Sequence, residues 1–229
     1  MKIDSKKLYT FVKKTTLNGA IETCVIRGSN EGLKINVRNG NAIAVYGLLK
    51  DVKDEITLPI KSSTILLNIL NAFNDKITIE VKGNMLKIFN EFREAEIVLS
   101  SEEFIENELK EKVPFEYSGD VSVQSSILKQ ALKNKEIIKG DTLVVEVKNN
   151  VLSILTGKVN FDKMIEKTKV DYADCTNELG AISFDVINVL EGLVKLSMKT
   201  DYPIKIVESD EEKNIQYFIA PLEVNKDEK

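Results

Sequence analysis

The stretch SEEFIENELKEKVPFEY, residues 101–117, separates two halves of the chain that follow the same pattern. It carries six glutamates against two lysines, with apolar residues such as Leu109 and Val113 among them. A charged segment between two structural units is expected to cross an outer surface, where its side chains stay hydrated. We therefore predict a connector at residues 101–117 that joins a first domain, residues 1–100, to a second, residues 118–229.

Helix-like and strand-like segments recur in the same order on both sides of this connector. Apolar side chains fall at helical spacing in four segments: residues 5–16, 62–73, 125–135 and 185–196. Short alternating runs separated by turn pairs such as Asn39-Gly40 predict antiparallel hairpins. Leu8 and Leu128 are 120 residues apart, and so are Asn68 and Asn188. The sequence therefore predicts an α+β fold built from two copies of one unit.

Length and composition exclude several classes of protein. The chain has 229 residues, of which 43% are hydrophobic and 30% charged, and its formal net charge is −4. These values predict folded domains, and no apolar run approaches the roughly 20 residues of a membrane-spanning helix. Cys24 and Cys175 stand in unrelated contexts, which favours reduced thiols over a disulfide. We expect a protein of the cytoplasm or the nucleus without a membrane partner.

The sequence offers no catalytic constellation. It contains no histidine, which excludes Ser-His-Asp and Cys-His catalysis and metal sites built on histidine. Neither a P-loop nor a Gly-x-Gly-x-x-Gly motif occurs. Asp171 with Asp174, or Asp210 with Glu211, are acidic pairs of the kind that hold magnesium, but solvated turn charges are the favoured interpretation. We therefore expect no enzyme activity, no metal and no cofactor.

The end of the chain and the end of the connector carry a resemblance to a known family. The segments are YPI at residues 202–204, QYFIAP at residues 216–221 with a polar acidic tail after it, and Val-Pro at residues 113–114. Together with the repeated units, they resemble the DNA sliding clamps, the family of proliferating cell nuclear antigen and the clamps of T-even phages. Members of that family pair two such domains in each subunit. Three subunits close into a ring, with short basic helices lining the hole and antiparallel sheets outside.

The resemblance implies a DNA polymerase processivity factor that encircles duplex DNA without reading its sequence. The expected partners are double-stranded DNA, a DNA polymerase and a clamp loader, in a homotrimer at a site of replication. That site would be the nucleoid, the nucleus or an infected host cell. Two alternatives stay open. One is a monomeric viral processivity protein that binds DNA through a basic face, and the other is one subunit of a heteromeric clamp.

Lysines opposite the apolar stripes of the predicted helices, or at helix ends, are the candidates for contact with DNA. Ammonium groups on mobile side chains bind phosphates without sequence preference, as a sliding ring requires. The candidates are Lys6, Lys7, Lys13, Lys14, Lys61, Lys129, Lys133 and Lys195. The plainer interpretation is a solvated helix face. Asp185 and Glu191 on the fourth predicted helix leave open whether that helix faces DNA.

The resemblance also implies a surface for partner peptides. In the family, peptides of polymerases and other replication proteins dock between the connector and the C-terminal strand, with a short apolar plug inserted. The matching positions here are Ala42, Ala44, Leu109, Val113, Pro203, Phe218, Ala220 and Pro221.

Subunits of the family join by pairing edge strands, which implies residues 94–100 of one copy against residues 162–170 of the next. The candidate interface residues are Ala95, Ile97, Leu99, Met164, Glu166 and Thr168. Lysines at positions 163, 167 and 169 would face Glu94 and Glu96. A head-to-tail contact of this kind closes into a ring when its rotation allows.

Overall fold

The structure, a computed structural model, describes residues 1–50, 52–109, 115–117, 119–140, 142–157, 162–181 and 183–222. The chain divides into two compact units. Unit 1 comprises Met1–Gly40, Ala44–Lys112 and Ser209–Gln216. Unit 2 comprises Asn41–Ile43, Val113–Glu208 and Tyr217–Lys229. Each unit therefore borrows a short piece of chain from the other half of the sequence.

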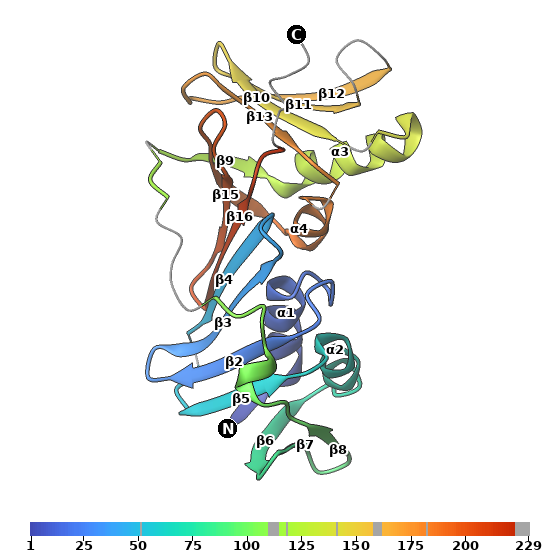
Figure 1. The fold of residues 1–229 in the computed structure, drawn as a ribbon, viewed down its shortest axis with the longest axis vertical. Coiled ribbons are helices and arrows are strands. Elements are labelled where there is room, and N and C mark those ends of the chain that lie inside the picture. Colours follow the sequence, from blue (N-terminus) through green and yellow to red (C-terminus); the bar gives the residue numbers. More distant parts are fainter. Residues whose placement is uncertain are drawn as a thin grey trace. The chain divides into compact units, whose positions relative to one another are not determined.

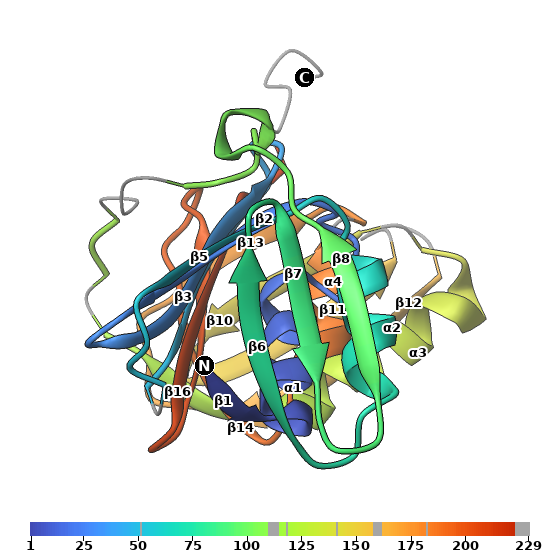
Figure 2. The ribbon, with the colours of Figure 1, turned by 90° about the horizontal axis from the view of Figure 1, so that it is seen from below.

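Unit 1 combines two antiparallel sheet segments with two α-helices (Figure 1). Its elements are β1 (Lys2–Asp4), α1 (Ser5–Thr15), β2 (Cys24–Ser29), β3 (Gly32–Asn39), β4 (Ile43–Leu49), β5 (Ile56–Ile60), α2 (Ser63–Asn71), β6 (Lys76–Lys82), β7 (Met85–Phe89), β8 (Glu94–Val98) and the 3-10 turn η1 (Glu102–Phe104). One segment has the strand order β5-β2-β3-β4 and the other β1-β6-β7-β8. Figure 2 looks onto the second segment, in which β8 is an edge strand.

Helix α1 illustrates how the sequence builds this unit. Asp4 caps its start, because the Oδ1 atom accepts a hydrogen bond of 3.0 Å from the backbone N–H of Lys7. Leu8, Phe11 and Val12 are buried along one stripe. Strand β4 approaches this stripe at Gly47, where an added Cβ would lie 2.3 Å from the Cγ2 atom of Thr15. Glycine at this position therefore allows close packing of helix and sheet.

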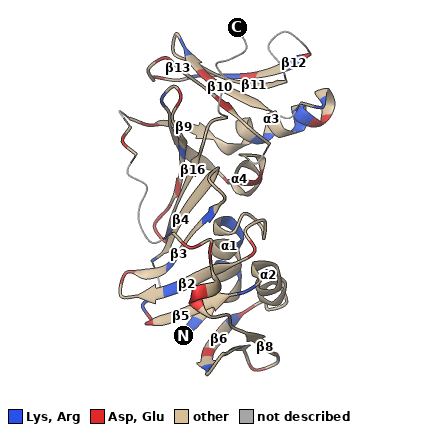
Figure 3. Cartoon of the chain, in the orientation of Figure 1, with Lys and Arg blue, Asp and Glu red and all other residues tan. Residues whose placement is uncertain are grey.

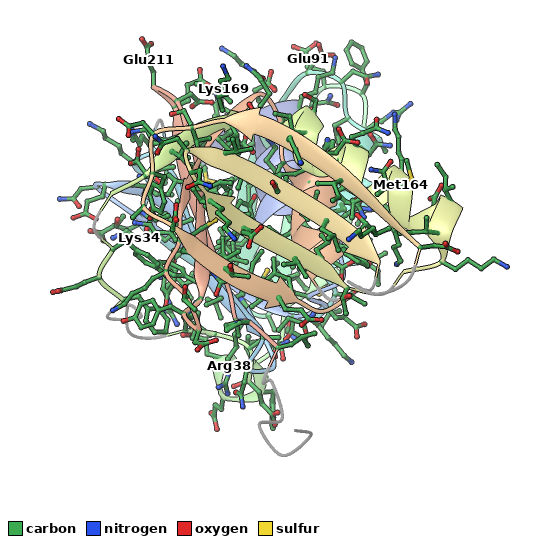
Figure 4. The ribbon with its side chains drawn as sticks, turned by 90° about the horizontal axis from the view of Figure 1, so that it is seen from above. Lys34, Arg38, Glu91, Met164, Lys169 and Glu211 are labelled. Atoms are coloured by element: carbon green, nitrogen blue, oxygen red, sulfur yellow. The ribbon has the colours of Figure 1, made fainter. Side chains whose placement is uncertain are left out.

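Unit 2 repeats the plan of unit 1. Its elements are β9 (Val121–Gln124), α3 (Ser125–Ile138), β10 (Leu143–Lys148), β11 (Val151–Gly157), β12 (Lys163–Lys169), β13 (Cys175–Leu179), α4 (Ser183–Val189), β14 (Leu193–Ser197), β15 (Ile204–Ser209) and β16 (Lys213–Ile219). One sheet segment has the order β12-β11-β10-β13, and strands β16-β15-β14-β9 form the other. Figure 4 looks onto the first of these segments, with Met164 and Lys169 near the two ends of the edge strand β12.

Buried serines mark the repeat at the level of single residues. Ser5 and Ser125 begin α1 and α3, and Ser63 and Ser183 begin α2 and α4, so both pairs keep the offset of 120 residues. All four serines are buried. The hydroxyl of Ser5 donates to the carbonyl of Phe73 at 2.9 Å, and that of Ser63 donates to the carbonyl of Ile21 at 2.7 Å. The predicted α+β class, with mostly antiparallel sheets and few helices, is confirmed.

The fourth helix differs from its prediction. A helix was expected at residues 185–196, but α4 spans Ser183–Val189 and the chain turns at Gly192, which has a φ of +62°. Leu193–Ser197 then forms β14, which pairs with β9 and β15. Val194 and Leu196 are buried on one face of this strand, so their alternation suits a sheet.

Within the described ranges, no helix has the length and apolar character needed to cross a bilayer.

Candidate functional site

Exposed lysines lie on the first helix of each unit, and Figure 3 shows them as blue segments on α1 and α3. On α1 the side chain of Lys6 is exposed and that of Lys13 is half-buried, with its Nζ atom 5.8 Å from the centre of the Tyr9 ring. On α3, Lys133 is exposed and Lys129 is half-buried. Each unit therefore has a basic helix face that an anionic partner can reach. Lys6 and Lys13 form it on α1, and Lys129 and Lys133 form it on α3.

Lys14 does not lie on that face, so the prediction placed it on the wrong side of the helix. Its side chain is only 2% exposed. At about 100° per residue, Lys14 lies about 60° around the helix from Phe11 and about 100° from Lys13. It therefore borders the stripe that packs into unit 1, and it is not available to a ligand at the surface.

Two further lysines of the predicted set stand at different kinds of position. Lys61 is exposed and directly precedes Ser62, the N-cap of α2, whose hydroxyl accepts from the backbone N–H of Ile65. Lys195 was expected at the end of a helix, but it lies on β14. There it is exposed, with its Nζ atom 3.5 Å from the Oδ2 atom of Asp120. Its ammonium group therefore already has an acidic neighbour.

Lys7 is also paired. Its Nζ atom lies 2.8 Å from the Oε1 atom of Glu212, in the acidic turn between β15 and β16. The same turn is tied down by Lys213, whose Nζ atom lies 2.6 Å from Asp210 Oδ2, and by the backbone N–H of Lys50, which donates to the carbonyl of Glu212. The carboxylates of Asp210 and Glu212 in this turn are thus each paired with a lysine of unit 1.

The connector is held against unit 1 by backbone pairing. Glu108 bridges Val37 of β3 in antiparallel fashion. The backbone N–H of Arg38 donates to Asn107 at 2.9 Å, and that of Leu109 donates to Asn36 at 3.0 Å. Residues 107–109 therefore extend the sheet beside the part of β3 that does not pair with β2.

Arg27 fixes the same segment through charge. Its Nε atom lies 2.7 Å from the Oε1 atom of Glu108, and its Nη2 atom lies 2.6 Å from the Oε2 atom of Glu102. The hydrogen bond to Glu108 is the main reason that the pKa of the guanidinium is raised. Sequence reasoning did not find Arg27, because it precedes its partners by 75 and 81 residues. The side chain of Phe104, on η1 in the same connector, is 75% exposed.

Five of the predicted peptide-site residues that the structure describes belong to unit 2. Ala42 and Ala220 are brought together, since the backbone N–H of Ala220 donates to the carbonyl of Ala42 at 2.8 Å. Pro203 and Pro221 are half-buried, and Phe218 is 8% exposed. Of the others, Ala44 and Leu109 belong to unit 1, and both are half-buried. Val113 lies outside the described residues.

Four aromatic rings gather around this part of unit 2, and we call them the aromatic surface: Phe115, Tyr117, Tyr202 and Phe218. Phe115 lies edge-on to Tyr202 at 5.0 Å between ring centres and 6.0 Å from Phe218. Tyr117 lies edge-on to Tyr202 at 5.7 Å, and its hydroxyl donates to the carbonyl of Pro203 at 2.7 Å. Burial raises the pKa of Tyr117, so this hydroxyl stays protonated and keeps its donor role.

Sequence reasoning missed three of these four rings. The signal that was present is the alternation of Phe115, Glu116 and Tyr117 directly after the connector, which directs both rings to one side of an extended chain.

The predicted interface strands are both edge strands. β8 ends the order β1-β6-β7-β8, and β12 begins the order β12-β11-β10-β13. The predicted residues Ala95, Ile97, Met164, Glu166 and Thr168 are half-buried, and Leu99 is buried. Glu166 is already engaged, because its Oε1 atom accepts a 3.0 Å hydrogen bond from the buried amide of Asn134 on α3.

The opposite faces of these strands are the exposed ones. On β8 the exposed side chains include Glu94, Glu96 and Val98, and on β12 they are Lys163, Ile165, Lys167 and Lys169. β8 is thus acidic where β12 is basic. A cavity of about 470 Å³ opens beside β8 in unit 1, lined by residues that include Ile65, Ile97 and Val98. Ile65 and Val98 are 53% and 57% exposed.

In the part of the chain that the structure describes, no group of three or more His, Cys, Asp or Glu side chains is placed to hold a metal ion. Cys24 and Cys175 are both buried as free thiols.

Comparison with known proteins decides the fold. No protein-family model matches the chain, and no curated protein matches its sequence. Solved structures do match. The proliferating cellular nuclear antigen of Entamoeba histolytica aligns with a TM-score of 0.78 at 18% identity, over 96% of this chain and 97% of that one. The A. fulgidus PCNA, solved with the C-terminal region of FEN-1 bound, aligns with a TM-score of 0.81 at 14% identity, over 96% of each chain. The chain has the fold of the DNA sliding clamps.

The sliding-clamp fold extends to a bacterial protein as well. The DnaN clamp of Pseudomonas aeruginosa, bound to griselimycin, aligns with a TM-score of 0.76 at 13% identity. That alignment covers 98% of this chain but 65% of the bacterial one. The resemblance read from the sequence is therefore confirmed as a sliding-clamp fold over nearly the whole chain.

Proposed function

We propose that this chain is a DNA polymerase processivity factor, a sliding clamp that encircles duplex DNA without sequence preference. The observation that carries the proposal is a sliding-clamp fold whose repeated helices α1 and α3 present lysines away from their buried stripes. Exposed ammonium groups give a salt-sensitive hold on phosphates and no base readout. The proposed DNA-contacting residues are Lys6, Lys7, Lys13, Lys61, Lys129, Lys133 and Lys195. The proposed role is tethering and not catalysis.

The same proposal assigns a role to each part of the chain. Residues 1–100 and 118–229 act as two clamp domains, and residues 101–117 act as the connector between them. The protein works where DNA is replicated, in the cytoplasm or the nucleus, together with a DNA polymerase and a clamp loader. Lys14 is left out of the DNA-contacting set because its side chain is buried.

Charge reversal on the helix face tests the DNA contact. Lys13→Glu with Lys133→Glu should weaken retention of the protein on DNA and reduce its stimulation of a polymerase, because two phosphate contacts become repulsive. The control is Lys82→Glu with Lys148→Glu, which makes the same change of charge at exposed strand positions. Unchanged stimulation by the Lys13 and Lys133 variant at moderate salt would exclude this helix face as the DNA track.

The peptide surface is the second half of the proposal. A polymerase segment would insert apolar side chains beside Pro203, Phe218, Ala220 and Pro221, with its backbone along the connector. Phe218→Ala with Pro221→Ala should abolish polymerase stimulation while DNA retention persists. Because Phe218 is only 8% exposed, circular dichroism and a thermal melt must first show that the variant is folded. A folded variant that stimulates normally would place the partner site elsewhere.

The assembly we propose is a homotrimer joined by β8 of one copy and β12 of the next. Three observations support it: both are edge strands, their exposed side chains have opposite charge, and a cavity lined in part by Ile65, Ile97 and Val98 adjoins β8. The proposed contacts are Ala95, Ile97, Leu99, Met164 and Thr168 with the charged residues around them. A heteromeric ring is the second candidate, since one similar structure is a PCNA2-PCNA3 complex from Sulfolobus tokodaii, with a TM-score of 0.77 at 13% identity.

A further inference from the structure

Two lysines flank the aromatic surface of unit 2. The Nζ atom of Lys199 lies 5.0 Å from the centre of the Tyr202 ring, and that of Lys205 lies 5.8 Å from the centre of the Phe218 ring. Lys199 is exposed and Lys205 is half-buried. Among the residues that the structure describes, neither ammonium group has a carboxylate partner. Each of two positive charges therefore stands over a ring of the aromatic surface.

This combination has a defined binding chemistry. Rings and prolines offer contact area to an apolar side chain, while a charged rim selects partners by sign and sets their register. We propose that the aromatic surface binds an extended segment of a partner protein that carries an aromatic or aliphatic side chain next to an Asp or Glu. The carboxylate is received by Lys199 and Lys205. This rests on the proposed function of the same surface and adds to it the charge of the segment that is bound.

Single-stranded nucleic acid is the competing occupant, because aromatic rings with nearby cations also hold stacked bases. The ring geometry favours a peptide. Phe115 and Tyr117 meet Tyr202 edge-on, with interplanar angles of 73° and 75°, so they do not form parallel platforms. Lys199 lies over Tyr202 and Lys205 over Phe218, and Phe218 is buried.

Peptide selection tests the proposal with the full chain. A phage-displayed library of random twelve-residue peptides is selected against the wild-type protein, against Lys199→Gln with Lys205→Gln, and against the control Lys82→Gln with Lys148→Gln. We expect wild type and control to enrich peptides with an apolar residue next to Asp or Glu. The Lys199 and Lys205 variant should keep the apolar preference and lose the acidic one.

Binding of one selected peptide gives the magnitude. Fluorescence anisotropy should show about three- to five-fold weaker binding when its acidic residue is changed to the amide, as for partly exposed ion pairs. The same change should have no effect on binding to the Lys199 and Lys205 variant, and added salt should reduce the difference.

Each other outcome overturns the proposal in a distinct way. Apolar enrichment without acidic enrichment would refute the role of the two lysines and leave the proposed peptide surface standing. No enrichment at all would refute the peptide surface and the inference together, while the DNA-tethering proposal is judged separately by the Lys13 and Lys133 variant. Binding of oligo(dT) that is lost in the Lys199 and Lys205 variant would assign the surface to nucleic acid.

Discussion

Arg27 is the residue on which the position of the connector depends most. It pairs with Glu102 and Glu108, and Glu108 also bridges β3 through its backbone. We expect Arg27→Gln to speed hydrogen exchange at the backbone amides of Arg38 and Leu109, which hold the connector on unit 1. The loss of global stability should stay within about 1 kcal/mol, because the guanidinium is partly exposed.

The matched control for Arg27 is Lys34→Gln, which breaks the exposed ion pair between Lys34 and Glu31. It should leave exchange at Arg38 and Leu109 unchanged. Equal exchange in wild type and Arg27→Gln would mean that backbone pairing alone holds the connector.

The buried thiol of Cys24 gives a second prediction about a single residue. It is fully buried on β2, and burial raises the pKa of its thiol to about 12. The thiolate is the reactive form, so Cys24 should not react with a disulfide reagent at pH 8 until the protein unfolds. Spectrophotometric titration in buffer and in urea measures this. An added cysteine in the exposed turn, Asn84→Cys, should react at once, and rapid native-state reaction of Cys24 would show that unit 1 opens readily.

The edge strands β8 and β12 give the prediction at the scale of elements. If they pair between copies, Glu96→Lys should weaken assembly, because it opposes the basic face of β12 with another positive charge. Lys167→Glu alone should do the same by opposing β8. The double variant should recover assembly in part, and analytical ultracentrifugation measures each mass. If neither single variant changes the mass, these strand faces do not meet in the assembly.

At the scale of helices and strands, the sequence predicts those features that residues close together in the chain determine. The apolar stripe of α1 and the hairpin turns follow from spacing and turn chemistry, so α1 was predicted to within one residue of Ser5–Thr15. The length of α4 was not predictable, because Leu193–Ser197 becomes a strand only by pairing with β9 and β15. Burial of Lys14 depends on what packs against it in the folded chain, which the spacing of residues along α1 does not specify. Contacts such as Arg27 with Glu108 join residues too distant in sequence for any local pattern to indicate.

For the whole molecule, the mass in solution distinguishes the proposed assemblies. The chain has a mass of 25.7 kDa, so a homotrimer should have three times that mass in multi-angle light scattering at micromolar concentration. A monomer would exclude a ring that closes by itself and favour the monomeric processivity protein. A monomer that reaches trimer mass only with a second protein would favour the heteromeric ring.

Net charge is a poor guide to this molecule as a whole. The sum of −4 conceals basic faces on α1 and α3, while acidic residues gather in the connector and in the turn before β16. Glu102, Glu108, Asp210 and Glu212 are all paired with basic residues of unit 1. Part of the acidic composition therefore serves to fix loops, and an anionic polymer still meets positive charge at the helices.

The burial of Lys14 has a consequence for chemical modification. Lys13 and Lys14 are neighbours in sequence, yet the side chain of Lys13 reaches solvent and that of Lys14 is buried. An acetyltransferase or an amine-specific label acting on the folded protein meets Lys13 and does not meet Lys14. In the peptide that contains both residues, modification of Lys13 therefore reports whether the helix face is occupied, and modification of Lys14 reports loss of the native packing that buries it.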